Sequence, residues 1–423
     1  MFVKKDLRKI PEILADATSR ASRVPLAPPK NDCNNDDAET KTNAKNDESN
    51  TIITELSFAR RAPEFLPSKT VSLLLQPHFL PALRNLLRLS LYDCGLETLA
   101  GIESGGQLHD KGGADSENDN TNKNEPIFPN LQQLDIGRNP QITNASLPST
   151  FSAQFPSLLE VWCDDCSFGP QIPEELLNIH TLHVVRMTKN KLRNSLNTDI
   201  GIKYWLDLRV LALDGNQLTE IGEGIGLLEH LEVLHLRQNE LREIPEKVPS
   251  GRNGRLRMVS LSSNRLEKFP VGLTEVNKIG FGESAISLRE VYLNGNKIQK
   301  LPSGVWEESN EDGMNGWLGS IKKLNLAHNA IGAEANENDE ANVIDKANVL
   351  PKDFLERFGM PNPATGECNK AEGIIVRLEG NPFAEFLKKK WIDDKRKKEI
   401  EEEEEKRKKE SEAEDEEPMD VDE

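Results

Sequence analysis

The sequence predicts an α/β solenoid, in which short parallel strands stack into a curved sheet on the concave face and turns and short helices form the convex face. Three observations predict this fold class. An eleven-residue frame of apolar and polar positions recurs about ten times along the 423 residues. Asparagine or cysteine stands at the ninth position of the copies. Segments with a shared proline pattern follow many copies, where the chain would return toward the next strand.

The recurring frame has the pattern L-x-x-L-x-L-x-x-N/C-x-L, as in "LRVLALDGNQL" from Leu208 and "LEVLHLRQNEL" from Leu231. Its fourth and sixth positions are apolar and its fifth is often polar, which is the alternation of a strand with one buried face. A stack of strands buries that face, because each repeat covers its neighbour. The copies begin at residues 86, 131, 158, 182, 208, 231, 256, 288, 321 and 373, the copy at 131 with one extra residue and the copy at 373 without its first Leu.

The ninth position lies where the chain must turn inward after each strand, which leaves backbone polar groups without a partner in the sheet. Each such buried group costs about 1 to 3 kcal/mol if it stays unpaired. An Asn side chain carries both donors and an acceptor and can satisfy these groups. We therefore predict a structural ladder of ninth-position side chains: Cys94, Asn139, Cys166, Asn190, Asn216, Asn239, Asn264, Asn296, Asn329 and Asn381.

These repeats resemble the leucine-rich repeat superfamily, and the resemblance covers roughly residues 83 to 386. The return segments, such as "QIPEELL" at 171 to 177 and "KLPSGVW" at 300 to 306, share an apolar-Pro-x-x-apolar pattern. Proline suits a short convex turn or a first helical turn, because it fixes its own φ and lacks a donor. The pattern is similar to the LPxxL signature of the intracellular Ras-group class. This match is at class level only, because successive copies here begin 23 to 52 residues apart and the repeats of that class are uniform.

A Cys-x-x-Cys pair stands in "EVWCDDCSF" at residues 160 to 168. Cys163 occupies the apolar sixth position of its copy and Cys166 the ninth, so the frame gives both residues a structural place. A zinc site would need two more Cys or His ligands at comparable spacing, and none stands nearby. A thioredoxin-type motif would open a helix inside a βαβ unit, which this segment does not. We interpret the pair as structural, with a redox or metal role as the alternative, and expect no metal and no cofactor.

Composition divides the chain into three parts. Residues 1–50 form an N-terminal tail whose short amphipathic segment is interpreted as a loosely attached helix, with docking on the array or on a partner as the alternative. Residues 51–386 form the solenoid, in which 51–82 is a degenerate copy that caps the first repeat. The polar segments near 104–125 and 333–342 lack apolar periodicity, and we predict that they are disordered insertions.

The remaining part is a charged tail at residues 387–423. From residue 388 onward it holds 11 Lys or Arg against 17 Asp or Glu, a net charge of −6. Several Glu residues precede Lys or Arg by four, an orientation that favours helical ion pairs worth about 0.2 to 0.5 kcal/mol each. We predict a solvated helix followed by a disordered acidic end. As an alternative, the basic clusters 388–390 and 395–398 would serve nuclear import, and the acidic end is similar to the tails of nuclear acidic leucine-rich proteins that bind histones.

Charge and composition exclude several functional classes. The net charge of −18 and the pI of about 5.1 argue against direct nucleic-acid binding. Five scattered cysteines make no disulfide framework, the first residues do not resemble a signal peptide, and no run of about 18 apolar residues would span a membrane. We expect a cytoplasmic protein, with a nuclear location as the alternative.

No Gly-rich phosphate loop, His-x-x-x-His pair or Gly-x-Ser-x-Gly elbow is present, so we expect no catalytic residues and no small-molecule substrate.

The third, fifth and seventh positions of each copy would be exposed on the concave face. Aromatic residues and Arg there are the types enriched at interface hot spots. The alternative is that these residues are ordinary surface positions and that the solenoid binds through its rim or insertions. The candidate partner-binding residues are Tyr92, Trp162, Arg186, His235, Arg237, Tyr292 and Arg377.

The sequence therefore predicts a non-catalytic scaffold, expected to be monomeric, that binds a protein partner on a preformed concave sheet. The Ras-group resemblance implies intracellular signalling, with a small GTPase or a phosphatase complex as the partner. One alternative is a nuclear regulator or histone-type chaperone that acts through the acidic tail. A second alternative is the substrate-recognition arm of a larger enzyme complex.

Overall fold

The computed structural model describes residues 54–58, 83–102, 125–196, 204–245, 255–273, 288–306, 321–333, 349–368 and 373–414. These residues belong to two compact units: unit 1 is Met1–Glu240 with Lys247–Leu256, and unit 2 is Leu241–Glu246 with Arg257–Glu423. The N-terminal amphipathic segment, most of the cap, nearly all of both insertions and the acidic end lie outside the described residues. What the sequence indicates for those segments stays a prediction.

Unit 1 contains a parallel sheet in the order β1-β2-β3-β4-β5-β7-β9. Each strand from β2 onward occupies the third to fifth positions of its copy, and neighbours pair in register, as Leu211 does with Leu234. The cap contributes β1, in which Leu56 lies opposite Leu89. The strands are β1 (Glu55–Ser57), β2 (Arg88–Ser90), β3 (Gln133–Asp135), β4 (Glu160–Trp162), β5 (Val184–Arg186), β7 (Val210–Ala212) and β9 (Val233–His235).

The return segments of unit 1 carry short helices and a second small sheet. α3 (Glu174–Leu177) begins directly after Pro173, whose φ of −59° already suits a helix start. β6 (Arg193–Leu196) and β8 (Gln217–Ile221) pair in parallel outside the main sheet. Short 3-10 helices are also found in the described parts of these segments, at Asn144–Ser146, Ser152–Gln154 and Glu223–Leu227.

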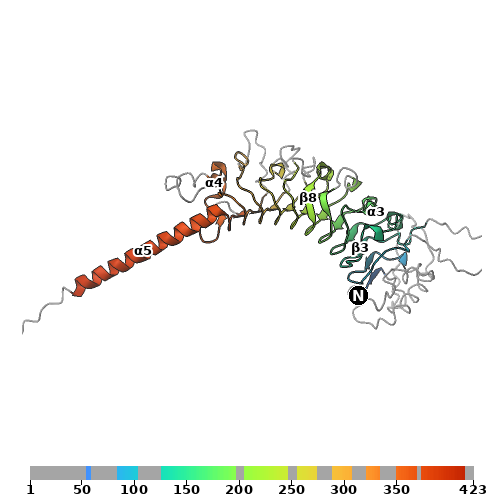
Figure 1. Ribbon diagram of the computed structural model, residues 1–423, viewed down its shortest axis with the longest axis horizontal. Helices are drawn as coiled ribbons and strands as arrows, with labels where there is room; N and C mark the ends of the chain where they lie inside the picture. The colour runs from blue at the N-terminus through green and yellow to red at the C-terminus, as the bar shows by residue number, and fades with distance from the viewer. Residues whose placement is uncertain are drawn as a thin grey trace, which may run out of the picture. The chain divides into compact units, whose positions relative to one another are not determined.

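Unit 2 continues the same frame with strands in the order β10-β11-β12-β14-β13. β10 (Met258–Ser260), β11 (Glu290–Tyr292), β12 (Lys323–Asn325) and β14 (Ile375–Arg377) are parallel, whereas the short β13 (Glu367–Cys368) pairs antiparallel with β14. Val271–Leu273 forms a 3-10 turn after Pro270, and α4 (Lys352–Phe358) begins after Pro351. Figure 1 shows strands stacked side by side in each unit, with α3 in unit 1 and α4 in unit 2 on the return side.

The apolar frame positions form the core of both units. Leu134, Leu211 and Leu324 at the fourth position are each 2% exposed or less. Between the strands and the return segments, aromatic rings fill the interior; Trp306 meets Phe354 edge to face with ring centroids 5.0 Å apart. The predicted solenoid, with a parallel sheet on one side and turns and short helices on the other, is confirmed.

Ninth-position Asn residues connect each copy to the one before it. The Oδ1 of Asn329 accepts a hydrogen bond from the backbone N–H of Ile298 at 3.1 Å, in the preceding copy. Its Nδ2 donates to the carbonyls of Leu293 at 3.0 Å, also in the preceding copy, and Leu326 at 2.9 Å in its own. The pattern recurs at Asn139, Asn216, Asn239, Asn296 and Asn381. Asn190 and Asn264 accept in the same way, from Phe168 and Leu241.

The eighth position has a left-handed backbone in every frame copy from 86 to 373. It is Gly in three copies, Gly215, Gly295 and Gly380, and another residue type in the rest. Lys189, for example, has a φ of +55°. This conformation costs a residue with a side chain roughly 1 to 2 kcal/mol. The cost is tolerated because the turn directs the ninth-position side chain into the core.

α5 (Pro382–Glu414) follows the last copy and is the helix of the charged tail. Phe383 and Ala384 at its start are buried, and the side chains from Lys388 to Lys408 are mostly exposed. Lys395 and Glu399 form an i,i+4 ion pair at 3.7 Å. Figure 1 shows α5 as one continuous helix, which begins before the tail boundary expected from composition.

Candidate functional site

In unit 1 the third, fifth and seventh positions form one exposed surface, which we call the strand surface. Each strand from β3 to β5 alternates half-buried, buried and half-buried residues, so the flanking residues of each strand lie on this surface. Four of the predicted binding residues of unit 1 are half-buried or exposed on it, and the fifth, Tyr92, lies at its β2 end.

Trp162 and Arg186 are brought together at the fifth positions of β4 and β5, where they are register partners. The guanidinium carbon of Arg186 lies 5.1 Å from the centroid of the Trp162 ring. A carboxylate oxygen of Asp164 is 2.7 Å from an Arg186 Nη, and its other oxygen accepts the backbone N–H of Thr188 at 2.8 Å. Arg186 is therefore held by a ring on one side and an anchored carboxylate on the other, contacts worth about 0.5 to 1 kcal/mol each at an exposed site.

The indole N–H of Trp162 is inaccessible to solvent and has no hydrogen-bond partner among the described residues. Tyr and Trp usually place such a group against an acceptor when it is buried. The ring itself is half-buried and exposes the remainder of its surface. Trp162 therefore offers apolar area in the middle of the surface, while its indole N–H is buried.

Two further carboxylates flank this cluster. Asp135 on β3 accepts hydrogen bonds from the backbone N–H of Gly137 at 3.0 Å and the hydroxyl of Ser90 at 3.1 Å. Asp214 accepts the backbone N–H of Arg237 at 2.6 Å. Burial raises the pKa of both carboxyl groups above the ordinary value, although these hydrogen bonds oppose the shift. Asp135, Asp164 and Asp214 thus place three carboxylates around the paired Arg186.

His235 and Arg237 lie beside Asp214, and their positive fields lower its pKa, which burial has raised. Arg237 is exposed and contributes its backbone N–H, so its side chain stays accessible. Tyr92 is separate: its ring lies close to Gly137, and it hydrogen-bonds with Arg138. The predicted residues therefore form a central group with Tyr92 at one side.

A row of valines was missed in the sequence prediction. Val184, Val210 and Val233 are the third-position residues of three neighbouring copies and are direct register partners, each half-buried. Together with Ala212, these valines make an apolar stripe beside the charged residues of the fifth and seventh positions. The signal in the sequence is a valine at the third position of three successive copies.

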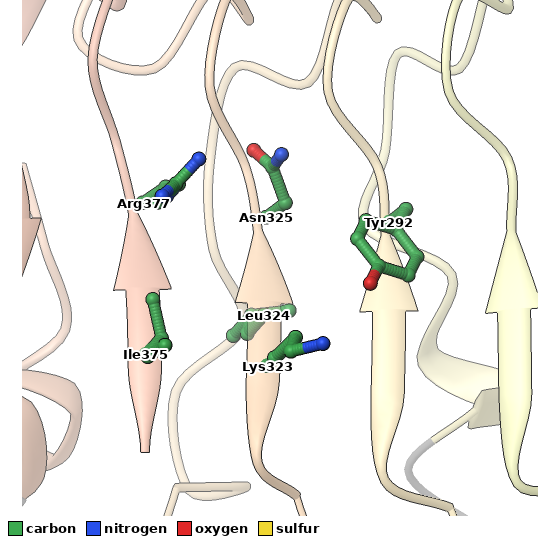
Figure 2. A pocket seen from close by; sticks show the side chains of 6 residues that line it. All are labelled: Tyr292, Lys323, Leu324, Asn325, Ile375 and Arg377. Carbon is green, nitrogen blue, oxygen red and sulfur yellow. The ribbon is translucent and has the colours of Figure 1, made fainter. Parts of the chain in front are cut away.

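In unit 2, Tyr292 and Arg377 line a hollow of about 250 Å³ over β11, β12 and β14 (Figure 2). The Tyr292 hydroxyl donates to Glu290 at 2.6 Å, and Lys323 is 3.1 Å from the other oxygen of the same carboxylate. These contacts lower the pKa of Glu290, mainly through the Tyr292 hydrogen bond. Arg377 pairs through Nε with Glu367 at 3.3 Å.

The cysteines of the Cys-x-x-Cys pair are free and buried. The Cys166 thiol donates to the carbonyl of Ile136 at 3.4 Å, as an Asn amide does in the other copies. Burial raises the pKa of Cys166 to about 12 and that of Cys163 well above its ordinary value. Neither sulfur therefore carries the thiolate that redox or metal chemistry requires at neutral pH. Cys94 occupies the same place, with its thiol 3.3 Å from the carbonyl of Phe58.

In the described ranges, no group of three or more His, Cys, Asp or Glu side chains is placed to hold a metal ion. Among the same residues, no helix combines the length and apolar character that a membrane crossing requires.

Residues 207–266 match the family model described as "Leucine rich repeat", and the matched segment contains the three complete copies of the frame that begin at 208, 231 and 256. The chain contains leucine-rich repeats. No curated protein matches the sequence. Proteins with this repeat are in general non-catalytic interaction modules that bind other proteins.

Solved leucine-rich repeat structures resemble the chain in part. A leucine-rich repeat protein of Leptospira interrogans is 21% identical over 78% of this chain and 67% of its own, with a TM-score of 0.48. One from Bacteroides thetaiotaomicron is 18% identical over 60% of this chain and 27% of its own, with a TM-score of 0.38. YopM from Yersinia enterocolitica is 19% identical over 58% of this chain and 38% of its own, with a TM-score of 0.36. The chain thus spans less than half of the last two proteins.

Proposed function

We propose that this leucine-rich repeat protein is a non-catalytic cytoplasmic scaffold that binds a protein partner on its strand surface. The observation that carries the proposal is the cluster of Trp162, Arg186 and Asp164 beside the valine stripe. Trp and Arg dominate interface energetics when a partner removes their remaining contact with water. The cluster is held by internal contacts before a partner arrives, so little side-chain entropy is lost on binding.

The class-level resemblance suggests a role in signalling, with a small GTPase or a phosphatase complex as the partner. A second candidate function is tail-driven binding of basic nuclear proteins. It is supported by α5, which presents a long exposed and highly charged helix. The two functions place the binding energy in different parts of the chain and so respond to different variants.

The test is affinity purification with four baits, followed by identification of the captured proteins. They are the full chain, Trp162→Ala with Arg186→Ala, Trp391→Ala with Arg396→Ala as the matched control, and a truncation ending at Leu387. The control removes an exposed Trp and an exposed Arg from α5. The truncation keeps the buried Phe383 and Ala384.

We expect the strand-surface variant to lose a defined partner that the control and the truncation retain. Reversible thermal unfolding of each bait separates a lost surface from a lost fold. If only the truncation loses its partners and these are basic nuclear proteins, the scaffold function is wrong and the tail carries the activity.

A further inference from the structure

The hollow of unit 2 is lined by residues of three neighbouring strands. Figure 2 shows Tyr292 on β11, Lys323, Leu324 and Asn325 on β12, and Ile375 and Arg377 on β14. Its volume of about 250 Å³ is below the roughly 300 to 1,000 Å³ of sites for drug-sized molecules. A space of this size accommodates one side chain or one terminal residue of a peptide.

Two donors of the hollow are already paired, since the Tyr292 hydroxyl and Lys323 both contact Glu290, whereas Arg377 and Asn325 keep donors for a ligand. Arg377 uses Nε for Glu367, and its two Nη groups have no partner in the described part of the chain. Asn325 accepts the backbone N–H of Ala327 through Oδ1 at 3.1 Å, which leaves its Nδ2 group unpaired among the described residues. A guanidinium fork with free Nη groups fits a carboxylate through two parallel hydrogen bonds.

The charge of the lining differs from that of the whole chain. Lys323 and Arg377 contribute two cations to the lining, although the chain has a net charge of −18. Each cation also contacts a carboxylate beside the lining, Lys323 that of Glu290 at 3.1 Å and Arg377 that of Glu367 at 3.3 Å. Leu324 and Ile375 add apolar surface, and Ile375 is 45% exposed. The hollow therefore offers hydrogen-bond donors to an anionic group and apolar contact to the aliphatic carbons that carry this group.

We propose that this hollow binds a carboxylate of a peptide, either a C-terminal carboxylate or the side chain of Asp or Glu. This proposal rests on the proposed function in one respect, because it assumes that the carboxylate belongs to a peptide. Arg377 and Asn325 donate to the carboxylate, and Ile375 packs against the adjoining aliphatic carbons.

The test uses the full chain with ¹³C-labelled Ile and Leu methyl groups, because Ile375 and Leu324 report directly from the hollow. Four peptides are titrated up to about 10 mM. Acetyl-Leu-Leu is compared with its C-terminal amide, and acetyl-Leu-Glu-Leu-amide with the Gln equivalent. The first pair detects a terminal carboxylate and the second a side-chain carboxylate.

We expect the Ile375 methyl signal to shift with at least one acidic peptide and not with its neutral counterpart. Arg377→Gln should weaken that binding at least tenfold, whereas Lys352→Gln, which removes an exposed cation on α4, should not. Unchanged methyl spectra elsewhere show that each variant is folded. Equal shifts with acid and amide, no shift with either acid, or unchanged binding by Arg377→Gln would overturn the proposal. The proposed function is tested separately at Trp162 and Arg186, so it survives that result.

Discussion

Asn325 and Asn329 belong to the same copy of the frame and have opposite surroundings. Asn329 is 7% exposed and makes hydrogen bonds to the backbone of its own copy and the preceding copy. Asn325 lies half-buried at the fifth position on β12 and accepts one hydrogen bond, from a residue two positions later. The same residue type thus stabilises the fold at the ninth position and is available to a partner at the fifth position.

The sharpest test of this comparison is Asn→Ala at both positions. We expect Asn329→Ala to lower the free energy of unfolding by about 3 kcal/mol, because it leaves several buried backbone groups unpaired. Asn325→Ala should cost less than about 1 kcal/mol, because water replaces its single bond. Urea denaturation measures both free energies of unfolding. Similar losses in the two variants would show that the fifth and ninth positions do not differ as described.

The eighth position gives a smaller effect that depends on the backbone. Gly215 has a φ of +68° and Lys189 a φ of +55° in the adjacent copy. We expect Gly215→Ala to lower the free energy of unfolding by about 1 kcal/mol and Lys189→Gly to raise it by about 0.5 kcal/mol. Urea denaturation of both variants checks the opposite signs. A loss of stability in Lys189→Gly would contradict the backbone strain that we assign to the eighth position.

A weaker effect is expected from the carboxylates of the strand surface. Burial raises the pKa of Asp135 in the folded protein above its ordinary value of 3.8. Ionisation of Asp135 therefore lowers the free energy of unfolding as the pH rises through the folded pKa, and it has no cost below 3.8. Asp135→Asn should therefore slightly raise the free energy of unfolding at pH 7, and the difference should vanish below about pH 4. Denaturation at a series of pH values tests this, with Asp165→Asn as an exposed control; a difference independent of pH would contradict it.

The smallest effect is expected from the tail. A chain ending at Leu387 retains Asn381 and the buried Phe383, so unit 2 should unfold at the same midpoint as in the full protein. The remainder of α5 is exposed, and its i,i+4 pairs are worth a few tenths of a kcal/mol. Thermal unfolding at low and high salt checks this prediction, and a lower midpoint for the truncated chain would show that α5 stabilises unit 2 beyond Phe383.

The sequence predicted the strands well because their positions follow from burial. Leu134, Leu211 and Leu324 are spaced by the frame, and any stack that buries them places the strands in the same register. The ladder was predictable for a similar reason, since the turn after each strand needs donors and acceptors at one place. These features depend on a repeated requirement and therefore appear as a repeated residue.

The candidate site was only partly predictable. The contact between Arg186 and Trp162 depends on which copies are neighbours, and the free Nη groups of Arg377 depend on Glu367, which belongs to the antiparallel β13 outside the frame. The left-handed eighth position has no residue signature, because Asp, Arg, Lys, Gln, Ser and His all occupy it. Surface geometry of this kind arises between copies and is not encoded in any one of them.

The hydrogen bonds of the ladder give the array a direction. The N–H of Leu218 is satisfied by Asn239 of the next copy, and the N–H of Ile331 by Asn381 of the last one. Removing the first copy costs Asn139 the acceptor Leu91 and both donors to its Oδ1, the N–H groups of Cys94 and Leu96. Removing the last copy takes away the acceptor for Ile331. The two ends of the array are therefore not interchangeable: a cut at the amino side leaves an Asn side chain without its partners, and a cut at the carboxyl side leaves a backbone N–H without its acceptor.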